Sequence, residues 1–355
     1  MKRFVFLLIA LSLLCLSLAA NAAPPPSEKD ENFTYYFVND TITIGAYTGE
    51  GGAVTLPSTY KDTPITAIDG YAFQYCETLT ELIIPEGYTY IGAHAFQGCQ
   101  NLTSVQFPAS LTYIDNGAFQ DCASLDNIVV PGTIQTFGID VFRNCTGLKN
   151  VTLEEGMTVL PTQIFYECIA LENIVIPSTV TEIQNGALRT CMSLTSVTLP
   201  ENLQILGNNV FRECSMLKEI TLPASLTEIG EACFMQTALK TLTIPDSVTA
   251  ISYQLCMSCG RLETVQLGNA TVSIAANAFQ GCMKLSAVNL PDTLTSIGQW
   301  TFSMCSRLTH LTLPASLTEI DPEAFQFCSQ LTVSVTPGSY AETYVSQVGL
   351  SLAAK

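Results

Sequence analysis

The sequence predicts a right-handed superhelix in which about twelve short coils stack into a solenoid with a cap at each end. Three observations predict this fold. A 23-residue pattern recurs along most of the chain, and the text "AHAFQGCQNLTSVQFPASLTYID" at 93–115 returns as "ANAFQGCMKLSAVNLPDTLTSIG" at 276–298. The third is energetic. About seven apolar positions per repeat, worth about 1.5–3 kcal/mol each when buried, do not offset about 1–2 kcal/mol for ordering each residue, so repeats must stack to fold.

Residues 1–22 are predicted to form a secretory signal peptide. Lys2 and Arg3 make a basic start, an apolar run follows, and Ala20-Asn21-Ala22 has the small-residue pattern of a cleavage site. A retained membrane anchor is the alternative. No second apolar span follows, so we expect a protein that is secreted or at the cell surface, without membrane insertion once the signal is removed.

Two segments separate this signal from the repeats. Residues 23–32 are rich in proline and charge and are expected to be an unordered linker. Residues 33–67 are expected to form the N-terminal cap. Within it, "FTYYFVNDTITIG" alternates apolar and polar residues as a β-hairpin that turns at Asn39-Asp40.

The repeats occupy 68–337. Each reads Ile, four residues, Phe, two residues, Cys, two residues, Leu, two residues, apolar, any, apolar, Pro. A period between 20 and 29 with a Leu-x-x-apolar-x-apolar core is typical of a leucine-rich repeat solenoid. Ten of the eleven steps between repeats are 23 residues, and the step from Ile229 to Ile251 is 22, because "FMQTAL" is one residue shorter than "FQGCQNL". The repeats open at Ile68, Ile91, Ile114, Phe137, Leu160, Ile183, Leu206, Ile229, Ile251, Ile274, Ile297 and Ile320.

Each repeat is expected to be rich in β-structure. In the second repeat, residues 102–107 are predicted as a strand that ends at Pro108, which cannot donate to a ladder, and 111–114 as a second extended piece. The stretch "GAHAFQGC" is expected to form a single helical or 3₁₀ turn that inserts Phe96. Residues 338–355 are expected to close the solenoid as a C-terminal cap with a turn and a short helix.

The segments "AFQGCQNLTSVQFP" and "LTSIG" resemble the BspA-like (treponema-pallidum-type) leucine-rich repeat family, and the resemblance covers about 68–337. It implies an exported or surface-displayed protein of bacteria or parasitic protists, often used in adhesion to host or neighbouring cells. It implies no shared catalytic site.

Thirteen cysteines follow the signal, and eleven of them occupy one phase of the repeat. We expect a structural ladder of buried free thiols, because equivalent side chains on stacked coils point in parallel and Cys is a small apolar residue with a weak S–H donor. Disulfides remain an alternative, since neighbouring coils lie about 5 Å apart, and a bridge between Cys233 and Cys256 is the specific case. The ladder comprises Cys76, Cys99, Cys122, Cys145, Cys168, Cys191, Cys214, Cys259, Cys282, Cys305 and Cys328.

Charge and composition exclude several function classes. The formal net charge is −17, so a nucleic acid would be repelled. The two histidines, His94 and His310, lie in repeats 2 and 11, too far apart for a catalytic triad. No phosphate-binding loop or metal-spaced His pair is present. The sequence therefore predicts no enzyme, no cofactor and no metal, and it disfavours a secreted hydrolase.

The outward side of the predicted strands is the expected working face. Its two columns carry hydroxyls and amides, with apolar residues toward the N-terminal half and no aromatic platform for a sugar. We expect a protein or glycan of host or neighbouring cells to bind there. The alternative is a structural spacer or surface-layer component, because Thr and Val are simply good strand residues. The candidate binding residues are Asn127, Val129, Asn150, Thr152, Asn173 and Val175.

Overall fold

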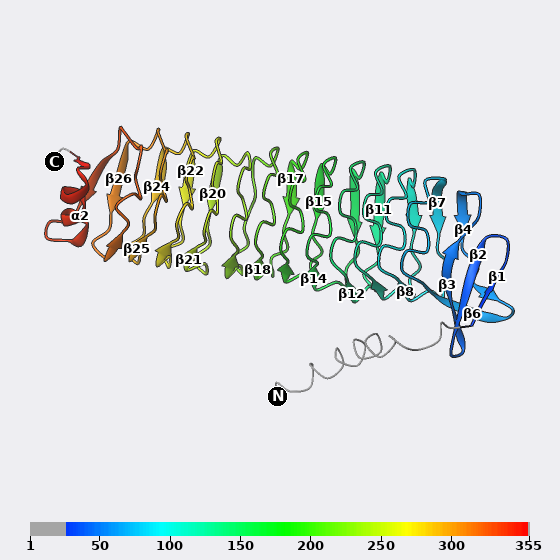
Figure 1. Cartoon of the computed structure of the whole chain (residues 1–355). Coiled ribbons are helices and arrows are strands. Elements are labelled where there is room, and N and C mark those ends of the chain that lie inside the picture. Colours follow the sequence, from blue (N-terminus) through cyan, green and yellow to red (C-terminus); the bar gives the residue numbers. More distant parts are fainter. Residues whose placement is uncertain (1–25, 354–355) are drawn as a thin grey trace, which may run out of the picture.

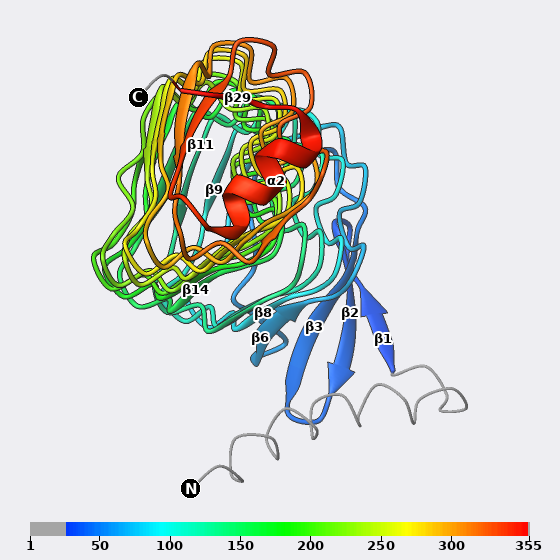
Figure 2. The same cartoon turned by 90° about the vertical axis from the view of Figure 1, so that its left-hand side faces the viewer.

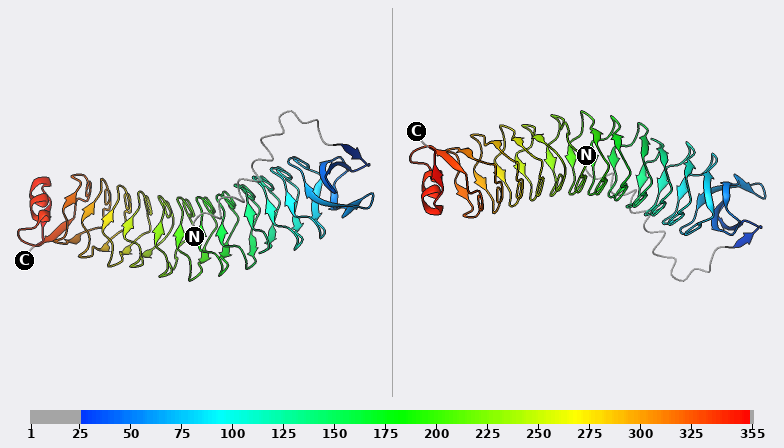
Figure 3. Two further views of the ribbon diagram at one scale, coloured as in Figure 1. Left: turned by 90° about the horizontal axis from the view of Figure 1, so that it is seen from below. Right: turned by 90° about the horizontal axis from the view of Figure 1, so that it is seen from above.

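The chain winds into a long solenoid. The structure is a computed structural model that describes residues 26–353, and it contains about fourteen turns, twelve of them the predicted repeats. The coils stack into a gently curved rod with the two caps at opposite ends (Figure 1, Figure 3). The signal peptide predicted for 1–22 lies outside the described residues. Within 26–353, no helix has the length and apolar character needed to cross a membrane.

One strand of each repeat contributes to what we call the strand face. Side chains alternate along it, so that in Asn127–Val130 the second and fourth residues are buried and the first and third are exposed. This alternation is what the Leu-x-x-apolar-x-apolar core predicts. Residues 219–222 occupy the same place in their repeat without forming a strand. The strands are β7 (Leu79–Ile83), β9 (Ser104–Gln106), β11 (Asn127–Val130), β13 (Asn150–Leu153), β15 (Asn173–Val175), β17 (Ser196–Thr198), β20 (Thr241–Thr243), β22 (Thr264–Gln266), β24 (Ala287–Asn289), β26 (His310–Leu313) and β28 (Thr332–Val335).

A second parallel ladder is built from two-residue strands at the opening of each repeat. Its register is one repeat per step, as in the pairing of Ile114 with Ile91. The ladder is interrupted twice, between β12 and β14 and between β19 and β21. Its members are β8 (Tyr90–Ile91), β10 (Tyr113–Ile114), β12 (Thr136–Phe137), β14 (Val159–Leu160), β16 (Glu182–Ile183), β18 (Ile205–Leu206), β19 (Glu228–Ile229), β21 (Ala250–Ile251), β23 (Ser273–Ile274), β25 (Ser296–Ile297) and β27 (Glu319–Ile320).

The third side of the coil, which we call the turn face, differs from the expected helical or 3₁₀ turn. The "GAHAFQGC" stretch forms separate turns, such as the one closed by Cys99 N–H donating to Phe96 O at 3.2 Å. Left-handed residues at His94 (φ 56°) and Gly98 (φ 72°) interrupt helical winding. Alternate amides therefore point along the rod axis, and Phe96 N–H donates to Ala118 O of the next coil at 2.7 Å.

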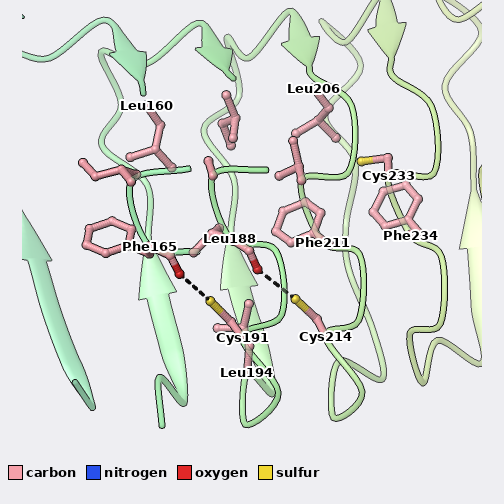
Figure 4. Packing of buried hydrophobic residues seen from close by; sticks show 14 of the residues in the cluster. Leu160, Phe165, Leu188, Cys191, Leu194, Leu206, Phe211, Cys214, Cys233 and Phe234 are labelled. Carbon is pink, nitrogen blue, oxygen red and sulfur yellow. Dashed lines mark hydrogen bonds between the residues drawn. The ribbon is translucent and has the colours of Figure 1, made fainter. Parts of the chain in front are cut away.

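Rows of phenylalanine fill the interior. The rings of Phe96 and Phe119 lie 4.9 Å apart and within 6° of parallel, and the row continues through the neighbouring coils. Leu188 and Cys256 take the Phe position in their repeats and interrupt the row. Figure 4 shows the first of these interruptions, with Leu188 between Phe165 and Phe211.

The N-terminal cap is an antiparallel sheet that continues into the second ladder. Strand β2 (Phe33–Val38) and strand β3 (Thr41–Tyr47) form a hairpin that turns at Asn39 and Asp40. Strand β3 then pairs in parallel with β6 (Thr63–Ile68), which β5 (Thr59–Tyr60) joins, and β4 (Gly52–Thr55) pairs with β7. Both ladders therefore begin before residue 68, and the cap itself contributes a coil.

The prediction of an unordered linker at 23–32 is wrong for residues 26–32, which the structure describes. Residues 27–29 form β1 (Ser27–Lys29), an edge strand antiparallel to β2. Local contacts explain the order. The Asp30 carboxylate accepts bonds from the Phe33 amide at 2.8 Å and the Tyr35 hydroxyl at 2.7 Å, and Lys61 pairs with Glu28. These tertiary partners override a composition that would leave an isolated segment unordered.

The C-terminal cap covers the last coil. Helix α2 (Tyr340–Val348) starts at Ser339, whose hydroxyl accepts from the Glu342 amide, and ends at Gly349 in the left-handed region. Figure 2, which views the rod end-on, shows α2 lying across the end of the solenoid. Tyr344 packs against Phe325, and β29 (Ser351–Leu352) extends the strand face beside β28.

Candidate binding face

The six candidate binding residues lie on three successive strands of the strand face, β11, β13 and β15. Asn127 pairs with Asn150 and Val129 with Thr152, so both columns run straight across the first two strands. All six side chains are exposed, and Val175 is 62% exposed. The structure therefore brings together the six residues that the sequence analysis selected.

The inward residues of these strands hold the outward ones in place. Ile128 and Ile174 are buried in the core, so their neighbours in sequence must face solvent. Within the described chain, the side chains of Asn127, Asn150 and Asn173 form no hydrogen bond with another residue. Three neighbouring amides are thus free to donate to and accept from a ligand.

A hollow that the sequence analysis missed borders this face. It has a volume of about 300 Å³, and it lies between β9 and β11, which share no ladder pairing. Phe107 provides an aromatic ring where the other repeats have Ile, Leu or Val, and this ring packs edge-on against Phe119 at 5.5 Å. Val129 lies on the rim, so the apolar column leads into an aromatic-lined depression. The replacement of Ile, Leu or Val by Phe107 at this repeat position is the sequence feature that could have indicated the hollow.

The predicted thiol ladder lies inside the coils, beside the phenylalanine row. Each Sγ–H from Cys99 onward donates to the carbonyl at the Phe position of the preceding repeat, over 2.9–3.3 Å. Figure 4 shows two of these bonds, from Cys191 to Phe165 O and from Cys214 to Leu188 O. Cys76, at the start of the row, is half-buried and lies near the Thr78 hydroxyl.

All thirteen cysteines in the described chain are free thiols. Burial raises the pKa of the Cys99 thiol to about 12 and the pKa of the Cys328 thiol to about 11. Thiols with pKa values this high are protonated at neutral pH and make poor nucleophiles. Cys233 and Cys256 are both buried, and no bridge joins them in this structure.

The two histidines occupy different faces and opposite ends of the rod. His94 lies on the turn face and stacks on Tyr71 at 5.4 Å, whereas His310 begins β26 on the strand face. Among residues 26–353, no group of three or more His, Cys, Asp or Glu side chains could hold a metal ion.

The turn face carries side chains that the sequence analysis did not single out. The ring of Tyr166 lies between two guanidinium groups, with Arg143 at 4.8 Å and Arg189 at 5.1 Å from its centre. Arg143 also faces the carboxylates of Glu167 and Asp140 at 3.5 and 3.9 Å. Burial raises the pKa of Asp140, and the Arg143 charge opposes this shift. Cations and anions are thus balanced within this face. Arg143, Tyr166 and Arg189 each follow the Phe position of their repeat directly, and this shared position could have indicated the cluster from the sequence.

Comparisons with known proteins agree with this architecture. The family described as "BspA type Leucine rich repeat region (6 copies)" matches residues 66–192, 156–259 and 249–346. A search of curated proteins found no match.

Solved structures show the same fold. The chain is similar to a leucine-rich repeat protein from Bacteroides ovatus, with 26% identity, a TM-score of 0.70, and coverage of 87% of this chain and 88% of that one. It is also similar to the pneumococcal vaccine antigen PcpA, with 18% identity, a TM-score of 0.54, and coverage of 94% and 100%. Since the family match spans most of the chain and the coils have the expected repeat structure, the protein belongs to the BspA-type leucine-rich repeat family.

Proposed function

We propose that this protein is a non-catalytic recognition scaffold, exported or displayed at the cell surface, that acts as an adhesin. Its ligand is a protein or glycan of host or neighbouring cells. The binding site is the part of the strand face formed by β11, β13 and β15.

One observation carries the proposal. Val129 and Val175 are 49% and 62% exposed in the middle of a flat polar face, among three asparagines whose side chains have no partner in the described chain. The exposed apolar groups supply surface from which a ligand can exclude water. The unpaired amides supply hydrogen bonds that fix the orientation of the ligand. The hollow beside Val129 adds a place where a partner side chain can be buried.

The alternative is a structural spacer, and the phenylalanine row is the observation that favours it. Stacked rings run from Tyr47 to Phe165 without a gap, and both ends of the rod are capped. Such a rod resists bending and does not polymerise end to end. A spacer would tolerate changes on the strand face but would be sensitive to removal of whole repeats.

The test replaces Val129, Thr152 and Val175 together with Lys. The mature chain is applied to immobilised extracellular-matrix proteins, glycosaminoglycans and intact cells, and the bound amount is measured. We expect the triple variant to lose at least ten-fold in binding, because three ammonium groups must then be desolvated at the centre of the interface.

The matched control replaces Thr243, Gln266 and Thr312, which occupy the same column in the C-terminal half, with Lys. Both variants gain the same charge. If the two variants bind equally well, the binding face is not at β11, β13 and β15. If neither differs from the unmodified chain on any probe, a spacer role is favoured.

A further inference from the structure

The second ladder lacks its usual bonds at Pro161. At the paired repeat openings, the residue after the opening position donates its amide to the opening carbonyl of the preceding repeat, as Gly138 does to Ile114 O at 2.8 Å and Gln184 to Leu160 O at 2.9 Å. Pro161 occupies this position and has no amide hydrogen. Strands β12 and β14 are therefore not paired with each other, although β12 pairs with β10 and β14 pairs with β16.

A second bond is missing beside the first. Thr181 N–H donates to Thr158 O at 2.9 Å, but within the described chain the amide of Thr158 makes no such bond to Gln135 O. The turn face of the same two coils stays joined, since Phe142 N–H donates to Ile164 O at 3.0 Å. The coils are therefore open on one side only.

The opening is a cleft of about 430 Å³, which we call the Pro161 cleft. One end is closed by a contact between two glycines. A Cβ on Gly132 would lie 1.8 Å from the carbonyl oxygen of Glu155, and Gly156 adopts a φ of 130°. Only glycine allows the backbones to approach this closely. Gly87 takes the Gly156 position in the first repeat, and the combination of Gly132 with Gly156 occurs at this pair of coils.

The lining of the cleft is uncharged and mixed in character. Gln135, Gln184 and Thr158 provide amide and hydroxyl groups, and the half-buried side chains of Phe137 and Val159 provide apolar surface. The side-chain oxygen of Gln184 accepts from the Thr162 amide and hydroxyl, both at 3.2 Å, which orients the Gln184 amide. The unpaired backbone groups of β12 and β14 add further acceptors and donors.

We propose that the Pro161 cleft binds a neutral saccharide of one or two rings. Each sugar hydroxyl donates and accepts, as does the mixed set of amides, hydroxyls and backbone groups, and the C–H faces of the ring match Phe137 and Val159. The absence of charged lining disfavours an ionic ligand. An extended peptide is disfavoured because each open strand edge is only two residues long, too short to fix a register.

This inference does not depend on the strand face. The cleft lies beside the second ladder, whereas β11, β13 and β15 present their outward columns on another side of the coil. Failure of either proposal therefore leaves the other standing. The strand-face lysine variants serve as the control that separates them, because they should bind saccharides as the unmodified chain does.

The test uses the mature chain and a panel of neutral mono- and disaccharides, with binding measured by saturation-transfer NMR and titration. The Pro161→Ala variant restores an amide at a position where Ala275 is found in a regular repeat, and it should close the ladder. We expect at least one saccharide to bind the unmodified chain and at least ten-fold weaker binding to Pro161→Ala. A matched pair adds a milder change: Gln135→Ala should weaken binding about five-fold, and Gln204→Ala, at the same repeat position outside the cleft, should not change it.

Three results would overturn the proposal. One is that no saccharide of the panel binds at millimolar concentration. Another is that a saccharide binds equally to the unmodified chain and to both cleft variants. The third is that a panel of extended peptides binds and loses affinity in Pro161→Ala while the saccharides do not bind, which would assign the cleft to a different ligand class.

Discussion

Two junctions of the second ladder are broken, and they are broken in different ways. Between β12 and β14 a proline removes the amide that should donate, while the repeat keeps its length of 23 residues. Between β19 and β21 the repeat is one residue short. The first junction has a cleft of about 430 Å³ that is lined by both coils. The difference lies in which part of the coil bears the change.

The shortened repeat is repaired by side chains. The Ser252 hydroxyl donates to Gly230 O at 2.8 Å, so a side-chain bond joins coils whose backbones are unpaired there. Thr237 takes the place of the ladder cysteine, donates to Phe234 O at 2.9 Å and lies 3.3 Å from the sulfur of Cys259. A shorter turn between the Cys and Leu positions would otherwise leave carbonyls of the interior unpaired, which is costly when they are buried.

The proline junction keeps its interior and changes only its outer side. The rings of Phe142 and Phe165 stack across it at 5.7 Å, and the Cys168 thiol donates to Phe142 O at 3.2 Å, as in a regular pair of coils. The groups left unpaired at Gln135 and Thr158 face solvent, where water satisfies them at little cost. An open cleft therefore costs little stability at the surface, whereas the same unpaired groups in the core would cost much more.

The largest expected effect comes from alkaline pH, which acts on the interior that both junctions share. Burial raises the pKa of the Cys99 thiol to about 12 and of the Cys328 thiol to about 11, from an ordinary value of about 9. The unfolded chain releases these protons first, so stability is full below about pH 8 and falls as the pH rises toward 11–12. Each titrating thiol contributes up to about 1.4 kcal/mol per pH unit.

Urea denaturation between pH 7 and 11 measures this loss. Buried tyrosines such as Tyr88, whose pKa is also raised by burial, act in the same direction, so the thiol share needs a variant. Cys328→Ala should make the pH dependence shallower by about one proton. A free energy of unfolding that stays constant from pH 8 to 11 would rule out a row of buried thiols.

The next effect is that of a new proline at a regular junction. Ala275 N–H donates to Ile251 O at 2.9 Å, and Ala275→Pro should remove this bond without adding a Cβ. We expect a loss of about 3 kcal/mol in the free energy of unfolding and a third interruption of the ladder. Thermal denaturation and amide hydrogen exchange check both parts.

Ala275→Gly serves as the control for this change, because it retains the amide. If it costs as much as the proline variant, the position is sensitive to any replacement and the missing donor does not explain the loss. If Ala275→Pro leaves exchange at the paired strands β21 and β23 unchanged, proline alone does not open a junction.

The repeat frame predicted the strand columns, the phenylalanine row and the position of the thiols, because each depends only on the phase of a residue within its own coil. The Cys99 bond to Phe73 O and the exposed side of Val129 follow from this phase. The Pro161 cleft could not be predicted in this way. Pro161 is visible in the sequence, but the acceptor of the missing hydrogen bond lies on the preceding coil. The missing bond therefore becomes apparent only when the ladder register is known. The order of β1 depends likewise on a distant partner, Lys61, which lies 33 residues from Glu28 in the sequence.

A smaller effect is expected at the shortened repeat. Thr237→Val keeps the shape of the side chain and removes the hydroxyl that donates to Phe234 O in the buried interior. We expect a loss of about 1–2 kcal/mol, because a buried hydrogen bond is lost and Phe234 O keeps only the weaker Cys259 thiol as a side-chain donor. Urea denaturation measures the loss. The matched change Thr227→Val, at an exposed hydroxyl that donates to Gln204 O, should cost less than 1 kcal/mol, and equal costs would contradict the repair.

The smallest effect on stability is expected for Pro161→Ala. The new amide gains one hydrogen bond of about 1 kcal/mol, and the loss of the proline ring frees the unfolded chain by a similar amount, so the two contributions nearly cancel. Amide hydrogen exchange should nevertheless slow at Val159 and Leu160, which gain a paired neighbour. A change in the free energy of unfolding above about 2 kcal/mol in either direction would mean that the open junction carries strain or support that its solvent-facing groups do not explain. The distinction between a repaired interior and a tolerated surface opening would then be wrong.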